Sequence, residues 1–292
     1  MKTTTVFTPT YNRAHCLYQV YLSLCSQTLK DFVWLIVDDG SKDNTYELVM
    51  GWQKEKVIEI EYYFKENGGL HTAYNSAINK AKTELFVCID SDDFMPDDAV
   101  EKIYEHWRQY GNDDYAGIIG LDYFKSGISI GGDLPNVKSL YFVELIDKFK
   151  YKGDTKMVHK TKLLKELNPM PTFNNEKNFN PIYLFLQVDK NYPLLVLNEN
   201  LCFVEYHPNG MSNNIFNQYI DSPNSFAELR RLNMTLERAS YQYIFKNAIH
   251  YVSSCLFAKE KKWIQKSPRR LITILASPFG LLLYFYILNK TK

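Results

Sequence analysis

Strand-like and helix-like patterns alternate along the first 110 residues of this 292-residue chain. Short apolar runs typical of buried strands are each followed by a stretch whose apolar residues have helical spacing. Such alternation favours a parallel sheet with helices on both faces. The expected strands are 3–9, 32–37, 57–64 and 85–90, and the expected helices are 14–28, 44–54, 70–82 and 97–110. We therefore predict an α/β fold.

A polar loop follows each of the four expected strands. These loops are TPTYN (8–12), DDGS (38–41), NGG (67–69) and DSDD (90–93). In parallel sheets the ligand binds beyond the carboxyl ends of the strands, which lie at one edge. The four loops therefore predict one binding site on that rim.

The fourth loop carries three carboxylates within four residues, Asp90, Asp92 and Asp93. Acids clustered at the end of a buried strand repel one another and lose hydration, which a divalent cation relieves. Mg²⁺ and Mn²⁺ commonly bridge protein carboxylates to substrate phosphates. The alternative is that Asp92 and Asp93 cap the helix that Pro96 opens. Three acids directly after a strand favour the cation.

The remaining loops suit a nucleoside diphosphate. Tyr11 offers a flat face for a base, and Asp39 could accept hydrogen bonds from a base or a ribose. Gly68 and Gly69 allow a backbone to approach a ligand closely. Taken singly, each has a structural alternative: a surface tyrosine, a turn aspartate and a helix entry. Their joint occurrence at successive strand ends favours the site.

Composition narrows the class of protein. The net charge of +1 argues against a nucleic-acid binder, and 46% apolar residues allow a proper core. The five cysteines are scattered without metal-site spacing, which indicates a reducing, cytoplasmic setting. The first residues, MKTTTVFTPTYN, lack the apolar core of a signal peptide.

Four motifs together resemble the nucleotide-binding half of a family 2 inverting glycosyltransferase of GT-A fold, a Rossmann-like architecture. They are TPTYNRA (8–14), LSLCSQTLKDFVWLIVDDGSKDNT (22–45), NGGLHTAYNSAINKAK (67–82) and ELFVCIDSDDFMPDDAV (84–100). The NGGLHTAYN wording also resembles a bacterial subgroup that builds surface polysaccharides and other glycans.

The resemblance implies roles for particular residues of this sequence. Tyr11 and Asp39 would hold the uracil of a UDP-sugar, and Asp90 would lie at the ribose. Asp92 would be the main protein ligand of a Mn²⁺ or Mg²⁺ ion on the diphosphate. The other residues expected to line the nucleotide site are Pro9, Gly68, Gly69, His71 and Ser91. Asp90 and His207 are further candidate metal ligands, although a His before Pro, as in EYHPNG, is often structural.

An inverting transfer needs a carboxylate base for the acceptor hydroxyl. The resemblance implies an acid roughly 80–100 residues beyond the metal motif, and Glu176 in FNNEKNF is our first candidate. The sequence departs from a common subgroup pattern here, because Ile182 follows Pro181 where an acid is expected. Asp154 and Asp189 are therefore the fallback candidates, and Glu176 could be a solvated loop acid.

The second half of the chain divides into two parts. Residues 111–222 are expected to complete, with 1–110, a GT-A domain of residues 1–222, and 223–292 to form a helical region. In that region the basic stretch 259–270 precedes the apolar run 271–288, which Pro278 and Gly280 interrupt. A kinked helix pair dipping into the cytoplasmic membrane leaflet fits this pattern. A helix packed on the domain or on another subunit is the alternative.

The sequence thus predicts a metal-dependent inverting glycosyltransferase that extends a glycan acceptor, lipid-linked in our interpretation, from a UDP-sugar. We expect it on the inner face of the cell membrane, peripheral or monotopic, without nucleic acid, and a homo-oligomer is compatible with the sequence. One rival hypothesis is a sugar-nucleotide nucleotidyltransferase, although TPTYNRA lacks the glycines of its phosphate loop. The other is a non-enzymatic, receiver-like acidic domain built on Asp38 and Asp39.

Overall fold

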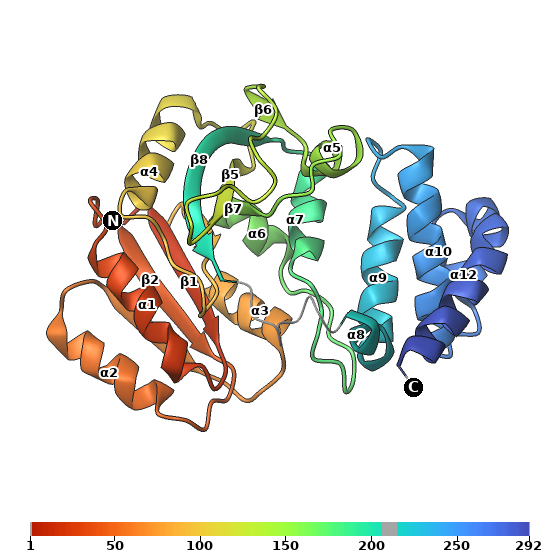
Figure 1. Ribbon diagram of the computed structural model, residues 1–292, viewed down its shortest axis with the longest axis horizontal. Coiled ribbons are helices and arrows are strands. Elements are labelled where there is room, and N and C mark those ends of the chain that lie inside the picture. The colour runs from red at the N-terminus through yellow and green to blue at the C-terminus, as the bar shows by residue number, and fades with distance from the viewer. Residues whose placement is uncertain (1, 206–214, 292) are drawn as a thin grey trace.

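The computed structural model describes residues 2–205 and 215–291. Within them one eight-stranded sheet crosses the protein, and a group of helices lies beside it (Figure 1). The strand order is β3-β2-β1-β4-β7-β5-β8-β6. The strands are β1 (Thr4–Thr10), β2 (Phe32–Asp38), β3 (Ile60–Phe64), β4 (Leu85–Cys88), β5 (Gly117–Phe124), β6 (Ser139–Leu140), β7 (Thr155–Lys160) and β8 (Leu194–Val204).

The first four strands form the parallel part of the sheet, as the sequence predicts. β1 lies between β2 and β4 and is parallel to both, and β3 extends the series beyond β2. β7 is antiparallel to both β4 and β5, whereas β5 and β8 are parallel. The sheet is therefore mixed, and its parallel part brings the carboxyl ends of β3, β2, β1 and β4 to one edge.

Helices cover both faces of the sheet, as expected for this alternation of elements. On one face α1 (Ala14–Cys25), α2 (Thr45–Glu55) and α4 (Ala99–Tyr110) pack Leu17, Trp52 and Ile103 into one cluster. On the other, α3 (Leu70–Lys80), α6 (Thr161–Leu167) and α7 (Ile182–Asp189) bury a second cluster. Neighbouring strand residues alternate between the clusters, Val6 in the first and Phe7 in the second, because strand side chains point to opposite faces.

Several boundaries differ from the sequence expectation. Pro96 does not open a helix directly: α4 begins three residues later, at Ala99. β3 begins at Ile60, three residues after the expected start at 57. The short helix α5 (Phe142–Asp147) follows β6.

The C-terminal helices form a group beside the sheet (Figure 1). They are α8 (Ile215–Asp221), α9 (Pro223–Asn233), α10 (Tyr241–Phe257), α11 (Trp263–Lys266) and α12 (Arg270–Lys290). Of these, α9 adds Leu229 and Leu232 to the second cluster. The expectation of a kinked helix pair in the tail is wrong, because α12 continues through Pro278 and Gly280 as one helix. Gly280 permits close packing rather than a break: a Cβ there would lie 2.5 Å from Val252 Cβ on α10.

Candidate active site

The loops after β2, β1 and β4 lie next to one another because these strands are neighbours in the sheet. Pro9 is within β1, opposite Val37 of β2. Tyr11 follows the strand with 46% of its surface exposed, so its ring is available to a ligand. The loop is fastened to the next one because the Asn12 amide donates to Ser41 Oγ at 2.8 Å.

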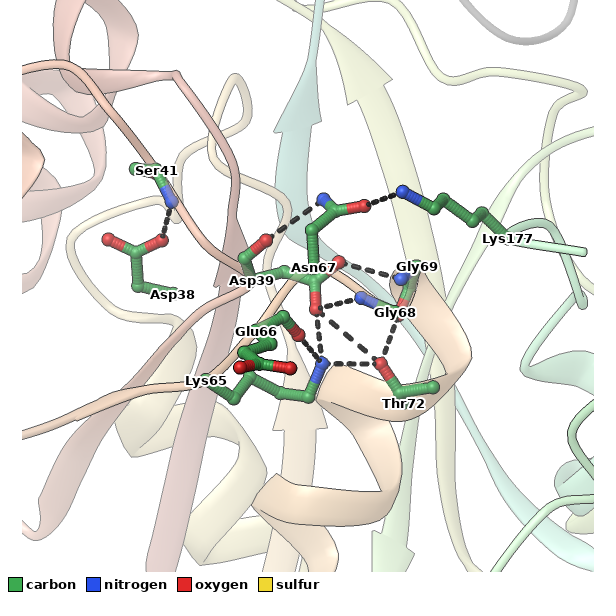
Figure 2. Close-up of polar contacts among 10 residues, drawn as sticks. All are labelled: Asp38, Asp39, Ser41, Lys65, Glu66, Asn67, Gly68, Gly69, Thr72 and Lys177. Carbon is green, nitrogen blue, oxygen red and sulfur yellow. Dashed lines mark hydrogen bonds and ion pairs between the residues drawn. The ribbon is translucent and has the colours of Figure 1, made fainter. Parts of the chain in front are cut away.

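Asp39 organises the loop that contains the two glycines (Figure 2). Its buried carboxylate accepts hydrogen bonds from the Gly68 amide at 3.0 Å and the Gly69 amide at 2.7 Å. Lys65 Nζ lies 2.5 Å from Asp39 Oδ1 and completes an ion pair. A carboxylate has about four acceptor positions, and three are taken by these close donors. Thr72 Oγ1 lies farther away, 3.5 Å from Asp39 Oδ1, and donates at 2.8 Å to the Gly69 carbonyl instead. Asp39 can therefore hold the loop and still accept a hydrogen bond from a nucleotide.

Gly69 directly precedes α3 and has a conformation that other residues rarely adopt, with φ +92°. A Cβ at this position would lie 1.9 Å from the carbonyl oxygen of Lys177. The Lys177 ammonium donates to Asn67 Oδ1 at 2.6 Å (Figure 2). The glycine is therefore required because the segment around Lys177 packs directly on the loop.

His71 lies in the first turn of α3 and is 1% exposed. Burial lowers its pKa, so the neutral imidazole is favoured. Its Nδ1 has no hydrogen-bond partner among the described residues, and its ring centroid lies 6.1 Å from that of Phe179. His71 thus lies behind the glycine loop in the core rather than on the open rim.

The acid loop after β4 presents its carboxylates in different directions. Asp90 is exposed and Ser91 is buried. Asp92 Oδ2 lies 2.5 Å from Arg13 Nη1, at the start of α1. The helix-cap alternative is wrong: the residue before the first turn of α4 is Asp98, whereas Asp92 pairs with Arg13 and Asp93 Oδ1 accepts from the Glu205 amide at 3.4 Å. Arg13 is a site residue that the sequence analysis did not single out.

A buried lysine lies beneath the acid loop. Lys156 of β7 is 12% exposed at its side chain, and its ammonium lies 3.8 Å from Asp122 Oδ2 and 4.0 Å from Asp93 Oδ2. Burial raises the pKa of Asp93 to about 7 and that of Asp122 to about 6, against the opposing effect of Lys156. The cluster cannot be recognised in the sequence because its members come from three separate segments.

The donor set suits a cation held jointly with a substrate. Within residues 2–205 and 215–291, no three His, Cys, Asp or Glu side chains form a metal site by themselves. Mg²⁺ typically binds one or two carboxylates together with substrate phosphates and waters. Asp92 and the exposed Asp90 carry carboxylate oxygens, the type of ligand that Mg²⁺ prefers.

Glu176 has a different environment from the one a base requires. Its carboxylate accepts hydrogen bonds from the amides of Asn224, at 2.9 Å, and Ser225, at 2.7 Å. The side chains of the same two residues donate to it at 2.7 Å and 2.6 Å. Because backbone amides in the first turn of a helix lack intrahelical partners, Glu176 caps α9. The alternative of a solvated loop acid is therefore wrong, because Glu176 is buried and caps a helix.

The two fallback acids, Asp189 and Asp154, differ from each other in burial and in their place in the fold. Asp189 is 4% exposed and accepts hydrogen bonds from the amides of Phe142 and Val143, so it caps α5. Asp154 is exposed and directly precedes β7. Because β7 is antiparallel to β4, its beginning lies at the edge where β4 ends in the acid loop. Asp154 therefore lies on the rim, and Asp189 does not. His207, the remaining candidate, lies outside the described residues.

The parallel strands, the glycine loop and the acid loop define a nucleotide-binding α/β fold of the GT-A class. The chain belongs to glycosyl transferase family 2: residues 5–163, more than half of its length, match that family.

Several proteins of known name are similar to this chain. TarP of Staphylococcus aureus (strain N315), a poly(ribitol-phosphate) beta-N-acetylglucosaminyltransferase, is 25% identical over 161 residues, covering 51% of this chain and 49% of TarP. Glycosyltransferase GlyA of Streptococcus pneumoniae serotype 4 is 33% identical over 113 residues, covering 39% of this chain and 16% of GlyA. Chondroitin synthase of Pasteurella multocida (strain Pm70) is 34% identical over 96 residues, covering 33% of this chain and 10% of the synthase. The chain thus spans about half the length of the first relative and less of the others.

Solved structures share the fold over nearly the whole chain. A crystal structure of S. aureus TarS 1-349 in complex with UDP-GlcNAc superimposes with a TM-score of 0.70 at 16% identity, covering 98% of this chain and 90% of that chain. The mannosyltransferase PcManGT from Pyrobaculum calidifontis, in complex with GDP-Man and Mn²⁺, gives a TM-score of 0.56 at 15% identity. The match covers 95% of this chain and 86% of PcManGT. These likenesses establish the GT-A fold.

Proposed function

We propose that this chain is an inverting glycosyltransferase that uses Mn²⁺ or Mg²⁺ to transfer a sugar from a UDP-sugar to a glycan acceptor. One observation carries the proposal. Tyr11, Asp39 and the acid loop each follow one of three neighbouring strands, so they lie on a single rim of the sheet. Membership of glycosyl transferase family 2 supports the reaction class. UDP-GlcNAc bound to a protein of the same fold, TarS, supports the donor class.

The nucleotide would be held by residues of the rim. The exposed Tyr11 ring stacks on uracil, and Asp39 uses its remaining acceptor position for a base or ribose donor. Asp92, with Asp90, would hold the Mn²⁺ or Mg²⁺ ion. When bound, the cation stabilises the negative charge that develops on the departing UDP. Arg13 adds a second positive charge beside Asp92.

We assign the base role to Asp154. An inverting transfer needs a carboxylate that takes the proton of the acceptor hydroxyl while the hydroxyl oxygen bonds to the anomeric carbon and the bond to the diphosphate breaks. Glu176 and Asp189 already accept hydrogen bonds from helix amides. Asp154 is the exposed candidate beside β4.

Replacement of the base separates binding from chemistry. Asp154→Asn should bind UDP and Mn²⁺ as the wild type does and lose transfer by about two orders of magnitude or more. Transfer within a few-fold of wild type in that variant would remove the assignment. Asp113→Asn is the matched control, because Asp113 is a fully exposed acid at the amino end of β5.

The acceptor in this proposal is a growing glycan of the bacterial cell surface, such as a capsule, carried on a membrane lipid. The enzyme would then work in the cytoplasm at the inner face of the membrane. The relatives' names support a polymer acceptor, because TarP is named for poly(ribitol-phosphate) and chondroitin synthase for chondroitin. We retain the division into a nucleotide-binding half (1–110), an acceptor half (111–222) and a helical region (223–292) as part of the proposal.

A panel of UDP-sugars tests the function directly. The purified full-length chain with Mn²⁺ should release UDP from one or a few members of the panel, and chelation should abolish the release. Nuclear magnetic resonance of the product should show an anomeric configuration opposite to that of the donor. Release of pyrophosphate instead of UDP would favour a nucleotidyltransferase, and failure to bind any nucleotide would favour a receiver-like domain.

A further inference from the structure

One side of α12 exposes a continuous apolar stripe. Leu271, Leu275 and Leu282 are 80%, 69% and 67% exposed. The exposed positions recur every three or four residues, so they lie on one side of the helix. The full stripe, called here the α12 outer face, consists of Leu271, Ile274, Leu275, Phe279, Leu281, Leu282, Phe285 and Tyr286.

The opposite side of α12 is fixed to the protein. Thr273, Ala276 and Ile287 are buried at helical spacing. Gly280 allows α12 to approach α10 so closely that a Cβ would meet Val252 at 2.5 Å. The ring of Tyr284 lies 4.5 Å from that of Phe257 on α10. At about 32 Å, α12 is long enough to span a bilayer. A membrane-spanning position would, however, remove its contacts with α10.

The segment next to the α12 outer face is strongly basic. Residues 259–270 contain six lysines and arginines and a single acid, Glu260. Glu260 is ion-paired with Lys266. Residues 271–290 add no acid. Trp263 lies within this segment, and aromatic residues favour the boundary between lipid and water.

We propose that the α12 outer face docks on the surface of an anionic lipid bilayer, with the helix axis in the membrane plane. The apolar side chains enter the boundary between headgroups and acyl chains, and the basic segment 259–270 binds the anionic headgroups. An exposed apolar face bordered by basic residues is the pattern of an in-plane membrane helix. The inference deepens the proposed function and rests on it only for the lipid-linked acceptor, which the docked enzyme would meet at the same surface.

Flotation with preformed vesicles tests the docking. The full-length protein should float with vesicles of phosphatidylcholine and phosphatidylglycerol and should remain unbound with phosphatidylcholine alone. Leu275→Glu combined with Leu282→Glu should lower the bound fraction by about tenfold or more, because a charge in the lipid boundary is costly. Val57→Glu combined with Val137→Glu is the matched control, since both valines are exposed elsewhere, and it should bind as the wild type does.

Calorimetry with UDP and Mn²⁺ on the same proteins separates this inference from the proposed function. Equal nucleotide binding in all variants shows that the fold is intact, so any loss of flotation belongs to the α12 outer face. Docking is contradicted if the wild type fails to float with anionic vesicles, or if the double glutamate variant still floats. It is also contradicted if light scattering shows a dimer that the glutamates dissociate, because a second copy would then cover the face.

Discussion

Replacement of Lys156 by methionine removes a buried positive charge and keeps an unbranched side chain that is one atom shorter. Its ammonium lies between the carboxylates of Asp122 and Asp93, which are 4% and 5% exposed. Removing one partner of a buried ion pair typically costs about 3–5 kcal/mol, because the other charge stays buried without compensation. The distances of 3.8 Å and 4.0 Å exceed those of direct hydrogen bonds, so we expect the lower end of that range.

Urea unfolding followed by tryptophan fluorescence measures this loss. For Lys156→Met the free energy of unfolding should fall by about 3 kcal/mol, and the melting temperature by roughly 6 °C or more. Adding Asp122→Asn should recover about 1 kcal/mol or more, because the two side chains are coupled.

Lys102 supplies the matched control for that experiment. It lies 2.9 Å from both Asp98 and Glu199, but its partners are 46% and 49% exposed. Surface ion pairs contribute about 1 kcal/mol or less, so Lys102→Met should change stability little. If Lys156→Met and Lys102→Met had equal effects, or if Lys156→Met left stability unchanged, the buried cluster would not be a structural ion network.

Three further perturbations follow from individual contacts. Glu176→Gln should lower stability by about 1–2 kcal/mol in thermal melting through the weakened α9 cap, with nucleotide binding intact; an unchanged melting temperature would contradict this role. Gly69→Ala should reduce UDP affinity in calorimetry by about tenfold or more, because φ +92° and the Lys177 carbonyl exclude a Cβ; unaltered affinity would show that the loop can shift. Burial lowers the pKa of His159 to about 3, below its unfolded value near 6.5, so protonation favours the unfolded chain and stability falls as pH drops from 6.5 toward 3. His159→Phe should flatten that decline in urea titrations at several pH values, and an unchanged slope would exclude His159 as its source.

The sequence predicted the structural features that depend on residues close to one another in the chain. The strand and helix patterns of the first 110 residues gave the parallel part of the sheet, because burial on both sides leaves continuous apolar runs. The acid and glycine loops were found because each directly follows a strand. Their meeting on one rim then followed from the rule for parallel sheets.

The errors arose where a residue's partner is distant in the chain. The sequence around Glu176 resembles a solvated loop, and the helix it caps begins 47 residues later at Pro223. Lys156 is one polar residue in a short strand, and only the fold brings it to Asp93. The tail was expected to form a helix pair interrupted at Pro278, but α12 runs through that residue as one helix and packs on α10.

Calorimetric titration of UDP into the protein tests the central claim, that the acid loop binds the nucleotide through a cation. With Mn²⁺ present the wild type should bind UDP, and with a chelator binding should weaken by about tenfold or more. Asp92→Ala should show the weak, chelator-like binding even with Mn²⁺. Equal UDP affinity with and without Mn²⁺, or an Asp92→Ala variant that still responds to the metal, would contradict the account.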